Sequence, residues 1–167
     1  PASIESHCIG FLTGSEFEAE TVKLGGGSMT RPHPGPFVWN FLEPEKGMLD
    51  FSVTDRWVKA AKENNIAILA TVFPFAEWDQ SKCHAAECEV DEIDTFYPRQ
   101  KEGRREGLPK SRCKHCSMDD YKAFLAKLVE RYDGDEKDDM EGLQIPINYW
   151  EISNEPEMKS RELTFFT

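Results

Sequence analysis

The residues with the clearest capacity for chemistry are Asn154 and Glu155, which end an apolar segment and precede Pro156. Segment 145–152 is rich in β-branched and aromatic side chains, which favour a strand. Pro156 ends that strand because proline has no N–H to donate. Parallel sheets carry their functional groups at the carboxyl ends of strands. The pattern therefore predicts a carboxylate at the mouth of a sheet, where Glu155 could give or take a proton.

Stretch 150–156, Trp-Glu-Ile-Ser-Asn-Glu-Pro, resembles the acid/base motif that closes the fourth strand of clan A glycoside hydrolases. These enzymes are retaining glycosidases built on a (β/α)8 barrel. Three upstream segments resemble the second strand, its loop and the third strand of such barrels, namely 30–39, 42–47 and 68–74. The resemblance implies that Glu155 is the general acid and base and that Asn154 bonds the sugar 2-hydroxyl. It places the nucleophile, a second glutamate, on a seventh strand.

Five further residues are candidates for substrate binding. The resemblance implies that Arg31, at the end of the second strand, orders the nucleophile. His33 could donate to a sugar hydroxyl, or it could be a rigid contact between two prolines. Trp39 and Trp78 follow the second and third strands, where indole rings either form platforms for a sugar or pack under loops. Glu77 precedes Trp78 and completes this set.

Four cysteines cluster in one polar segment, with the spacing Cys-x4-Cys and Cys-x2-Cys: Cys83, Cys88, Cys113 and Cys116. The spacing fits a structural zinc site, in which His84 or His115 could replace a thiolate, and it fits disulfides equally well. We expect these four sulfurs to meet one another or a shared metal ion, and Cys8 to remain a separate buried thiol. Apart from this zinc alternative, the expected chemistry requires no cofactor. The acidic run 133–139 has enough oxygens for calcium but reads more simply as a solvated turn.

Strand and helix patterns alternate along the chain, which predicts a parallel sheet with helical crossovers. We expect strands near 7–12, 28–33 and 66–73, and a fourth that ends at Glu155. Helices should begin after Ser15, Ser52 and Ser117, each of which has an acidic residue three positions later. The predicted fold class is α/β, as the first four units of a TIM (β/α)8 barrel. Residues 1–167 would form a single domain, with a cysteine-containing insertion at about 76–116 after the third strand.

The length of 167 residues is too short for a complete barrel, which needs about 250 residues. A half-barrel would expose sheet edges and an apolar inner face. We therefore expect a missing second half, a partner chain or self-association, with carbohydrate as the substrate.

The formal net charge of −11 argues against binding to nucleic acid or to anionic lipid. No apolar run is long enough to cross a membrane, and the first residues lack the pattern of a signal peptide, so the sequence does not assign a compartment. The predicted function is retaining hydrolysis of an O-glycosidic bond, with this chain carrying the acid/base half of the site. Two alternatives stay open: a non-catalytic carbohydrate-binding or scaffolding half-barrel, and an interaction module stabilised by metal at the cysteines.

Overall fold

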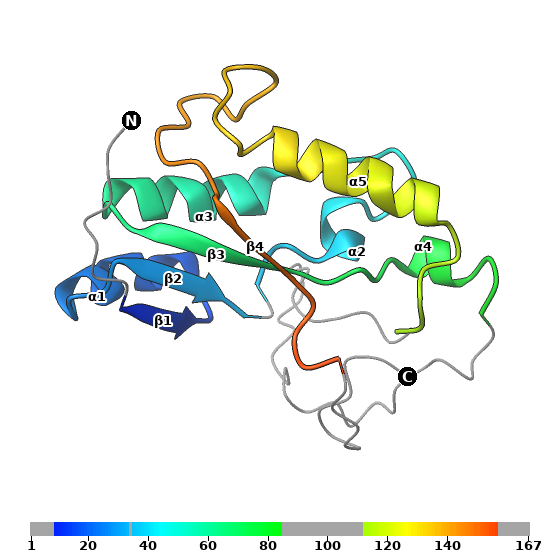
Figure 1. Cartoon of the computed structure of the whole chain (residues 1–167), viewed down its shortest axis with the longest axis horizontal. Helices are drawn as coiled ribbons and strands as arrows, with labels where there is room; N and C mark the ends of the chain where they lie inside the picture. The colour runs from blue at the N-terminus through cyan, green and yellow to red at the C-terminus, as the bar shows by residue number, and fades with distance from the viewer. Residues whose placement is uncertain (1–8, 34, 85–111, 157–167) are drawn as a thin grey trace.

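Four short parallel strands form the sheet in the computed structural model, which describes residues 9–33, 35–84 and 112–156. The strands are β1 (Gly10–Thr13), β2 (Met29–Pro32), β3 (Ala67–Val72) and β4 (Tyr149–Ile152). Their order in the sheet is β1-β2-β3-β4, so neighbours in sequence are neighbours in space (Figure 1). The strand alternation expected from the sequence is confirmed. Residues 7 and 8 of the expected first strand lie outside the described residues.

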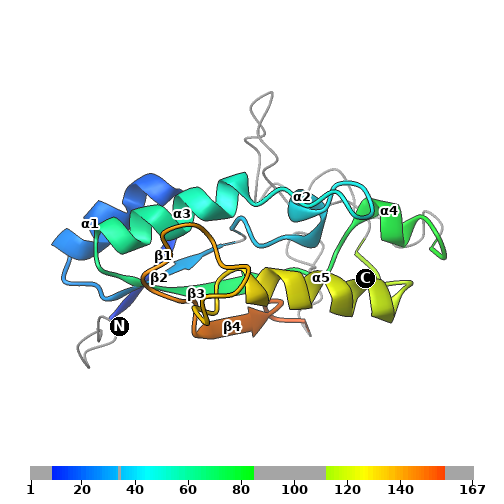
Figure 2. The ribbon, with the colours of Figure 1, turned by 90° about the horizontal axis from the view of Figure 1, so that it is seen from above.

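Helical segments connect the strands. A 3-10 turn η1 (Glu16–Glu18) and α1 (Ala19–Leu24) link β1 to β2, and α2 (Trp39–Leu42) and α3 (Ser52–Glu63) link β2 to β3. After β3 come α4 (Glu77–Gln80) and α5 (Met118–Glu130). In both views α1 and α3 lie side by side along the sheet (Figures 1 and 2). None of the described helices is both long enough and apolar enough to span a bilayer.

The core lies between the helices and one face of the sheet. Alternation along β3 directs Ile68, Ala70 and Val72 to this face, where they pack against Val58 of α3 and Leu128 of α5. The opposite face, which we call the inner face, carries Arg31 of β2, Thr71 of β3 and Glu151 of β4. The core side chains thus hold the strands in place. The inner face and the carboxyl ends of the strands lie outside this core.

The helix starts follow the sequence closely at one position and less closely at another. Ser117 caps α5 as expected, because its Oγ accepts from the N–H of Asp120 at 3.2 Å. In α3 the N-cap is Phe51 rather than Ser52, and Val53 is 37% exposed. Thr54 faces the core instead, because Thr54, Trp57, Val58 and Ala61 follow the i, i+3, i+4, i+7 spacing of one helix face.

The expected insertion at about 76–116 is partly described. Its first residues form α4, and residues 85–111 lie outside the described residues. The carboxylate of Asp79 is fully buried and accepts from the N–H groups of Cys116 at 2.7 Å and Ser117 at 3.1 Å. These two N–H groups belong to the N-cap of α5 and the residue before it, so the buried carboxylate is stabilised by both donors and by the nearby helix dipole. Asp79 therefore fixes the start of α5 beside α4.

Candidate active site at the carboxyl end of the sheet

Side chains from three neighbouring strands meet at the carboxyl end of the inner face. Arg31 comes from β2, Thr71 from β3 and Glu151 from β4, and Thr71 lies directly opposite Glu151 in the sheet register. Oε2 of Glu151 accepts from Thr71 Oγ1 at 2.6 Å, from Arg31 Nη2 at 2.6 Å and from Arg31 Nε at 2.9 Å. One carboxylate oxygen on β4 therefore gathers donors from β3, its neighbour, and from β2, one strand further away.

The same arginine reaches the predicted catalytic pair. Nη2 of Arg31 donates to Oδ1 of Asn154 at 2.7 Å, and Nδ2 of Asn154 donates to Oε2 of Glu155 at 3.2 Å. Since the arginine can only donate, the amide oxygen of Asn154 must face it and the amide N–H groups must face Glu155. The expected meeting of Arg31, Asn154 and Glu155 at one edge is thus present in the geometry.

The backbone after β4 explains how two consecutive side chains reach one place. Ser153 has φ +63° and Glu155 has φ +44°, values that L-residues rarely adopt. The N–H of Ser153 still donates to the carbonyl of Val72 at 2.8 Å, so the irregular backbone begins directly at the end of the ladder. Asn154 is half-buried and Glu155 is exposed. Strained backbone of this kind is frequently found at functional sites.

His33 lies beside this cluster. Its backbone N–H donates to the carbonyl of Thr13 at 3.1 Å, and its ring meets Phe73 edge-on at 5.9 Å. Burial lowers the pKa of His33 below its usual 6.5, and the positive charge of Arg31 lowers this pKa further, while Glu151 and Glu155 raise it. The net lowering keeps the ring neutral at neutral pH. A neutral imidazole offers one donor and one acceptor beside the carboxylates.

Comparison with known proteins bears on the fold. No family model matches the chain, and no curated protein matches it. Among solved structures, it is similar to the β-galactosidase of the psychrophilic Marinomonas ef1, with a TM-score of 0.56 and 14% identity over 89% of this chain. The chain shares its fold with part of that protein.

Two further structures show the same relation. The cold-adapted β-galactosidase of Rahnella sp. R3 has a TM-score of 0.51 and 23% identity over 83% of this chain. The polyextremophilic β-galactosidase of the Antarctic haloarchaeon Halorubrum lacusprofundi has a TM-score of 0.51 and 17% identity over 89%. The chain spans 22%, 18% and 21% of the Marinomonas, Rahnella and Halorubrum proteins, respectively.

Trp39 requires a correction. The sequence offered it as a sugar platform, but the side chain is fully buried and stacks on Phe124 at 5.7 Å, with Nε1 donating to Glu43 at 2.7 Å. The first turn of α2 carries Trp39 under the start of α5, so neither ring face is open. The structure therefore assigns this tryptophan to the core.

Trp78 and Glu77 lie on α4, apart from the carboxyl-end cluster. The indole of Trp78 is partly buried, donates to the carbonyl of Glu43 at 2.7 Å and carries the Lys82 ammonium 4.3 Å from its ring centre. Glu77 is exposed, and its N–H donates to Asn40 Oδ1 at 2.8 Å. Within the described residues, no bond joins either side chain to Arg31, Asn154 or Glu155.

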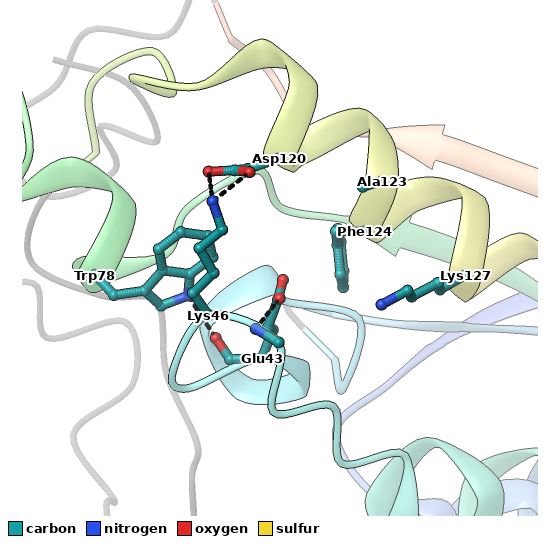
Figure 3. Close-up of a pocket in the computed structure, with 8 residues that line it drawn as sticks. Glu43, Lys46, Trp78, Asp120, Ala123, Phe124 and Lys127 are labelled. Atoms are coloured by element: carbon teal, nitrogen blue, oxygen red, sulfur yellow. Dashed lines mark hydrogen bonds and ion pairs between the residues drawn. The ribbon is translucent and has the colours of Figure 1, made fainter.

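A small hollow of about 140 Å³ lies beside Trp78 on the helical side (Figure 3). Lys46 crosses it to reach Asp120, at 2.8 Å from Oδ1, and Phe124 and Lys127 line it from α5. It shares no residue with the cluster of Arg31, Asn154 and Glu155. The hollow is therefore separate from the candidate active site.

The cysteines of the cluster that the structure describes form disulfides and do not form a zinc site. Cys83 and Cys116 are bonded, with Cα atoms 5.8 Å apart, and Cys113 is also disulfide-bonded. Cys88 and Cys8 lie outside the described residues. His84 brings a nitrogen within 4.8 Å of both bonded sulfurs, but it lies 2.7 Å from the carbonyl of Lys114, and the bonded sulfurs have no thiolate charge for zinc. This group would fit a metal ion only after reduction.

The acidic run uses its carboxylates locally. Asp133, Asp135 and Asp139 bring oxygens within 4.8 Å of one another. Asp139 accepts from the N–H groups of Gly134 at 3.1 Å and Glu136 at 2.8 Å, and Asp133 accepts from that of Asp135 at 3.2 Å. These bonds fit the expected acidic turn.

Glu151 and Thr71 were not singled out by sequence reasoning, although they connect the whole cluster. The signal for Glu151 was present as a single charge within an otherwise apolar strand, two residues after an inward-facing Tyr149. Thr71 had no comparable signal, because threonine is common in strands.

Proposed function

We propose that this chain carries the acid/base half of the active site of a retaining glycoside hydrolase. The observation that supports this most strongly is the placement of Asn154 and Glu155 on the same side of the end of β4, connected at 3.2 Å and held by Arg31 from β2. The two residues lie at the carboxyl edge of a parallel sheet, which is where such folds carry their catalytic residues. The fold shared with β-galactosidases agrees with this function.

In the proposed reaction Glu155 protonates the leaving oxygen of the glycoside and later takes a proton from the attacking water. Its exposed side chain can reach a bound substrate. The N–H groups of Asn154 are turned away from Arg31, so one can bond the sugar 2-hydroxyl, a contact that strengthens as positive charge develops at the anomeric carbon. In this proposal the neutral ring of His33 would bond a further hydroxyl.

The nucleophile would come from further strands of a (β/α)8 barrel. The resemblance places it on a seventh strand, and the described residues contribute the four strands β1 to β4. On the inner face Leu12 is 64% exposed and Tyr149 is 51% exposed, as expected for a surface that other strands cover. We propose that two further strands, in the positions of the fifth and eighth strands of a barrel, pair with β4 and β1. These strands would come from more of the same protein or from a partner. Sedimentation of the isolated 167-residue chain at micromolar concentration should then show self-association, whereas a clean monomer would contradict the missing half.

β-Galactosides are the first substrates to test, because the three similar structures are β-galactosidases. The decisive variant is Glu155→Gln in the protein at its natural length, compared with Glu141→Gln, an exposed glutamate elsewhere. Turnover of an alkyl galactoside should fall by about a hundredfold or more in Glu155→Gln, because its leaving group needs a proton. An activated aryl galactoside should lose much less in the glycosylation step.

Equal losses for both substrates would show that Glu155 is structural. The same conclusion would follow if the melting temperature of Glu155→Gln fell so far that unfolding at the assay temperature accounted for the lost activity. No hydrolysis of any glycoside by the unaltered protein, at its natural length and with its partner, would contradict the proposed function.

A further inference from the structure

Glu151 occupies a central position in the cluster, because it bonds both Arg31 and Thr71. Its Oε2 accepts three hydrogen bonds, two from Arg31 of β2 and one from Thr71 of β3. The side chain of Glu151 is 35% exposed and that of Arg31 is 24% exposed. Water can therefore weaken this ion pair, unless the hydrogen bonds also fix the geometry of the pair.

The two bonds from Arg31 do fix that geometry. Nε and Nη2 lie on the same edge of the planar guanidinium, and both donate to one oxygen, at 2.9 and 2.6 Å. Nη2 keeps a second hydrogen, which points to Asn154 Oδ1 at 2.7 Å. The orientation of the guanidinium therefore decides which end of the Asn154 amide faces Glu155.

Thr71 holds the carboxylate in turn. Its hydroxyl donates at 2.6 Å to the same oxygen that Arg31 contacts, and its backbone is buried within β3. Rotation of the Glu151 carboxyl group would break three bonds together. The direction of donation runs from Thr71 and Arg31 towards the carboxylate, and from Arg31 through Asn154 to Glu155.

We propose that Glu151, braced by Thr71, is a positioning residue that orients Arg31 so that the Asn154 amide presents its N–H groups to Glu155 and to the substrate. This proposal rests on the proposed glycosidase function for its catalytic consequence. Its structural consequence, the orientation of Asn154, can be measured without any turnover.

The kinetic test uses Glu151→Gln, which keeps the length and removes the charge, and Glu151→Asp, which keeps the charge and shortens the reach. Both should lower kcat for an aryl galactoside by roughly ten- to a hundredfold with little change in KM, because the Asn154 contact strengthens in the transition state. Thr71→Val should give a smaller loss in the same direction. In an Arg31→Lys background the further loss from Glu151→Gln should shrink to about twofold, because the lysine cannot make the paired bonds.

The structural test uses nuclear magnetic resonance on the full chain. In the unaltered protein the Arg31 Nε–H should exchange slowly with solvent, and the two Asn154 side-chain amide signals should be shifted from those of exposed asparagines. Glu151→Gln should accelerate exchange at Arg31 at least about tenfold and shift both Asn154 signals, and Thr71→Val should do so in part. Glu141→Gln is the matched control and should change neither.

The outcomes separate the two proposals. Unchanged Arg31 exchange and unchanged Asn154 signals in a folded Glu151→Gln protein would overturn the positioning role, whatever the activity. The expected spectral changes in a protein that hydrolyses no glycoside would support the positioning role and contradict the proposed function. Should Glu151→Gln fail to fold, the same readouts in Thr71→Val decide, and no change in either would overturn the proposal.

Discussion

Asn154 and Glu155 are adjacent in sequence, and yet Nδ2 of the first lies 3.2 Å from Oε2 of the second. In a regular strand such neighbours point to opposite faces of the sheet. The positive φ angles at Ser153 and Glu155 remove this alternation immediately after β4. The pairing of the two side chains is therefore a property of three consecutive backbone positions.

The first prediction concerns Ser153, which is 4% exposed with φ +63°. Ser153→Gly should be tolerated and should change the free energy of unfolding by no more than about 1 kcal/mol, because glycine adopts this conformation without steric cost. Ser153→Val should lose about 1 to 3 kcal/mol, because a β-branched residue is disfavoured at positive φ. Urea unfolding of the two variants measures the difference. Equal stability of both would contradict a strained turn at the strand end.

A second prediction follows the charge of His33. Its ring signals should titrate with a midpoint below 6.5. Arg31→Gln should raise this pKa, because the arginine lowers it, and Glu155→Gln should lower it further, because Glu155 raises it. Proton spectra recorded from pH 4 to 8 on the three proteins check these opposite shifts. Shifts in the same direction would mean that His33 does not lie between these charges.

The same pKa has a consequence for stability. The unfolded chain takes up a proton at His33 near pH 6.5, before the folded protein does. The contribution of His33 to stability is therefore complete above pH 6.5, and it is lost as the pH falls from there through the lowered pKa of the folded state. In His33→Gln the free energy of unfolding should lose that part of its pH dependence. Denaturant unfolding at several pH values between 4 and 8 measures the slope, and an unchanged slope would refute the shift.

A third prediction concerns the disulfide between Cys83 and Cys116, which are 33 positions apart. Replacing both by serine should lower the free energy of unfolding by about 2 to 4 kcal/mol, because the link restricts the unfolded chain. Thermal unfolding under non-reducing conditions provides the comparison. The oxidised protein should contain no stoichiometric zinc by elemental analysis, since the bonded sulfurs cannot ligate it. Zinc bound one to one in the oxidised protein would contradict this account.

A fourth prediction separates core packing from sugar binding at Trp39. Trp39→Ala should cost about 3 to 5 kcal/mol, because a fully buried aromatic ring is removed. Trp39→Phe should cost about 1 to 3 kcal/mol, because the Glu43 carboxylate loses a donor. Any galactose binding that the unaltered protein shows by calorimetry should be unchanged in Trp39→Phe. A loss of binding with little loss of stability would restore the platform interpretation.

Much of the fold was accessible from the sequence because the deciding patterns are local. The apolar run before Pro74 is typical of a buried strand such as β3, and the spacing of Tyr121, Phe124 and Leu128 after Ser117 is typical of a helix with one buried face, as in α5. Segment 145–152 predicted β4, although Tyr149 and Ile152 are 51% and 56% exposed rather than covered. Local patterns specify an element, but they do not specify what lies against it.

The site was accessible only in part. The sequence Asn-Glu-Pro indicates the end of a strand, because a proline and two polar residues disfavour its continuation whatever the rest of the chain does. The bonds of Glu151 to Arg31 and Thr71 bridge 120 and 80 positions, and a single chain gives no signal for such pairs. The burial of Trp39 depends likewise on α5, and the choice between zinc and disulfides depended on how near Cys83 and Cys116 come in space.

The link between Cys83 and Cys116 also bears on how this protein could diversify. It joins two Cα atoms 5.8 Å apart, and Asp79 holds the same junction through two backbone N–H groups. The distance between α4 and the start of α5 is thus set by bonds at the junction. Loop exchange between these two cysteines should therefore leave the strands and the carboxyl-end cluster in place, which makes the junction a natural grafting point for altering specificity.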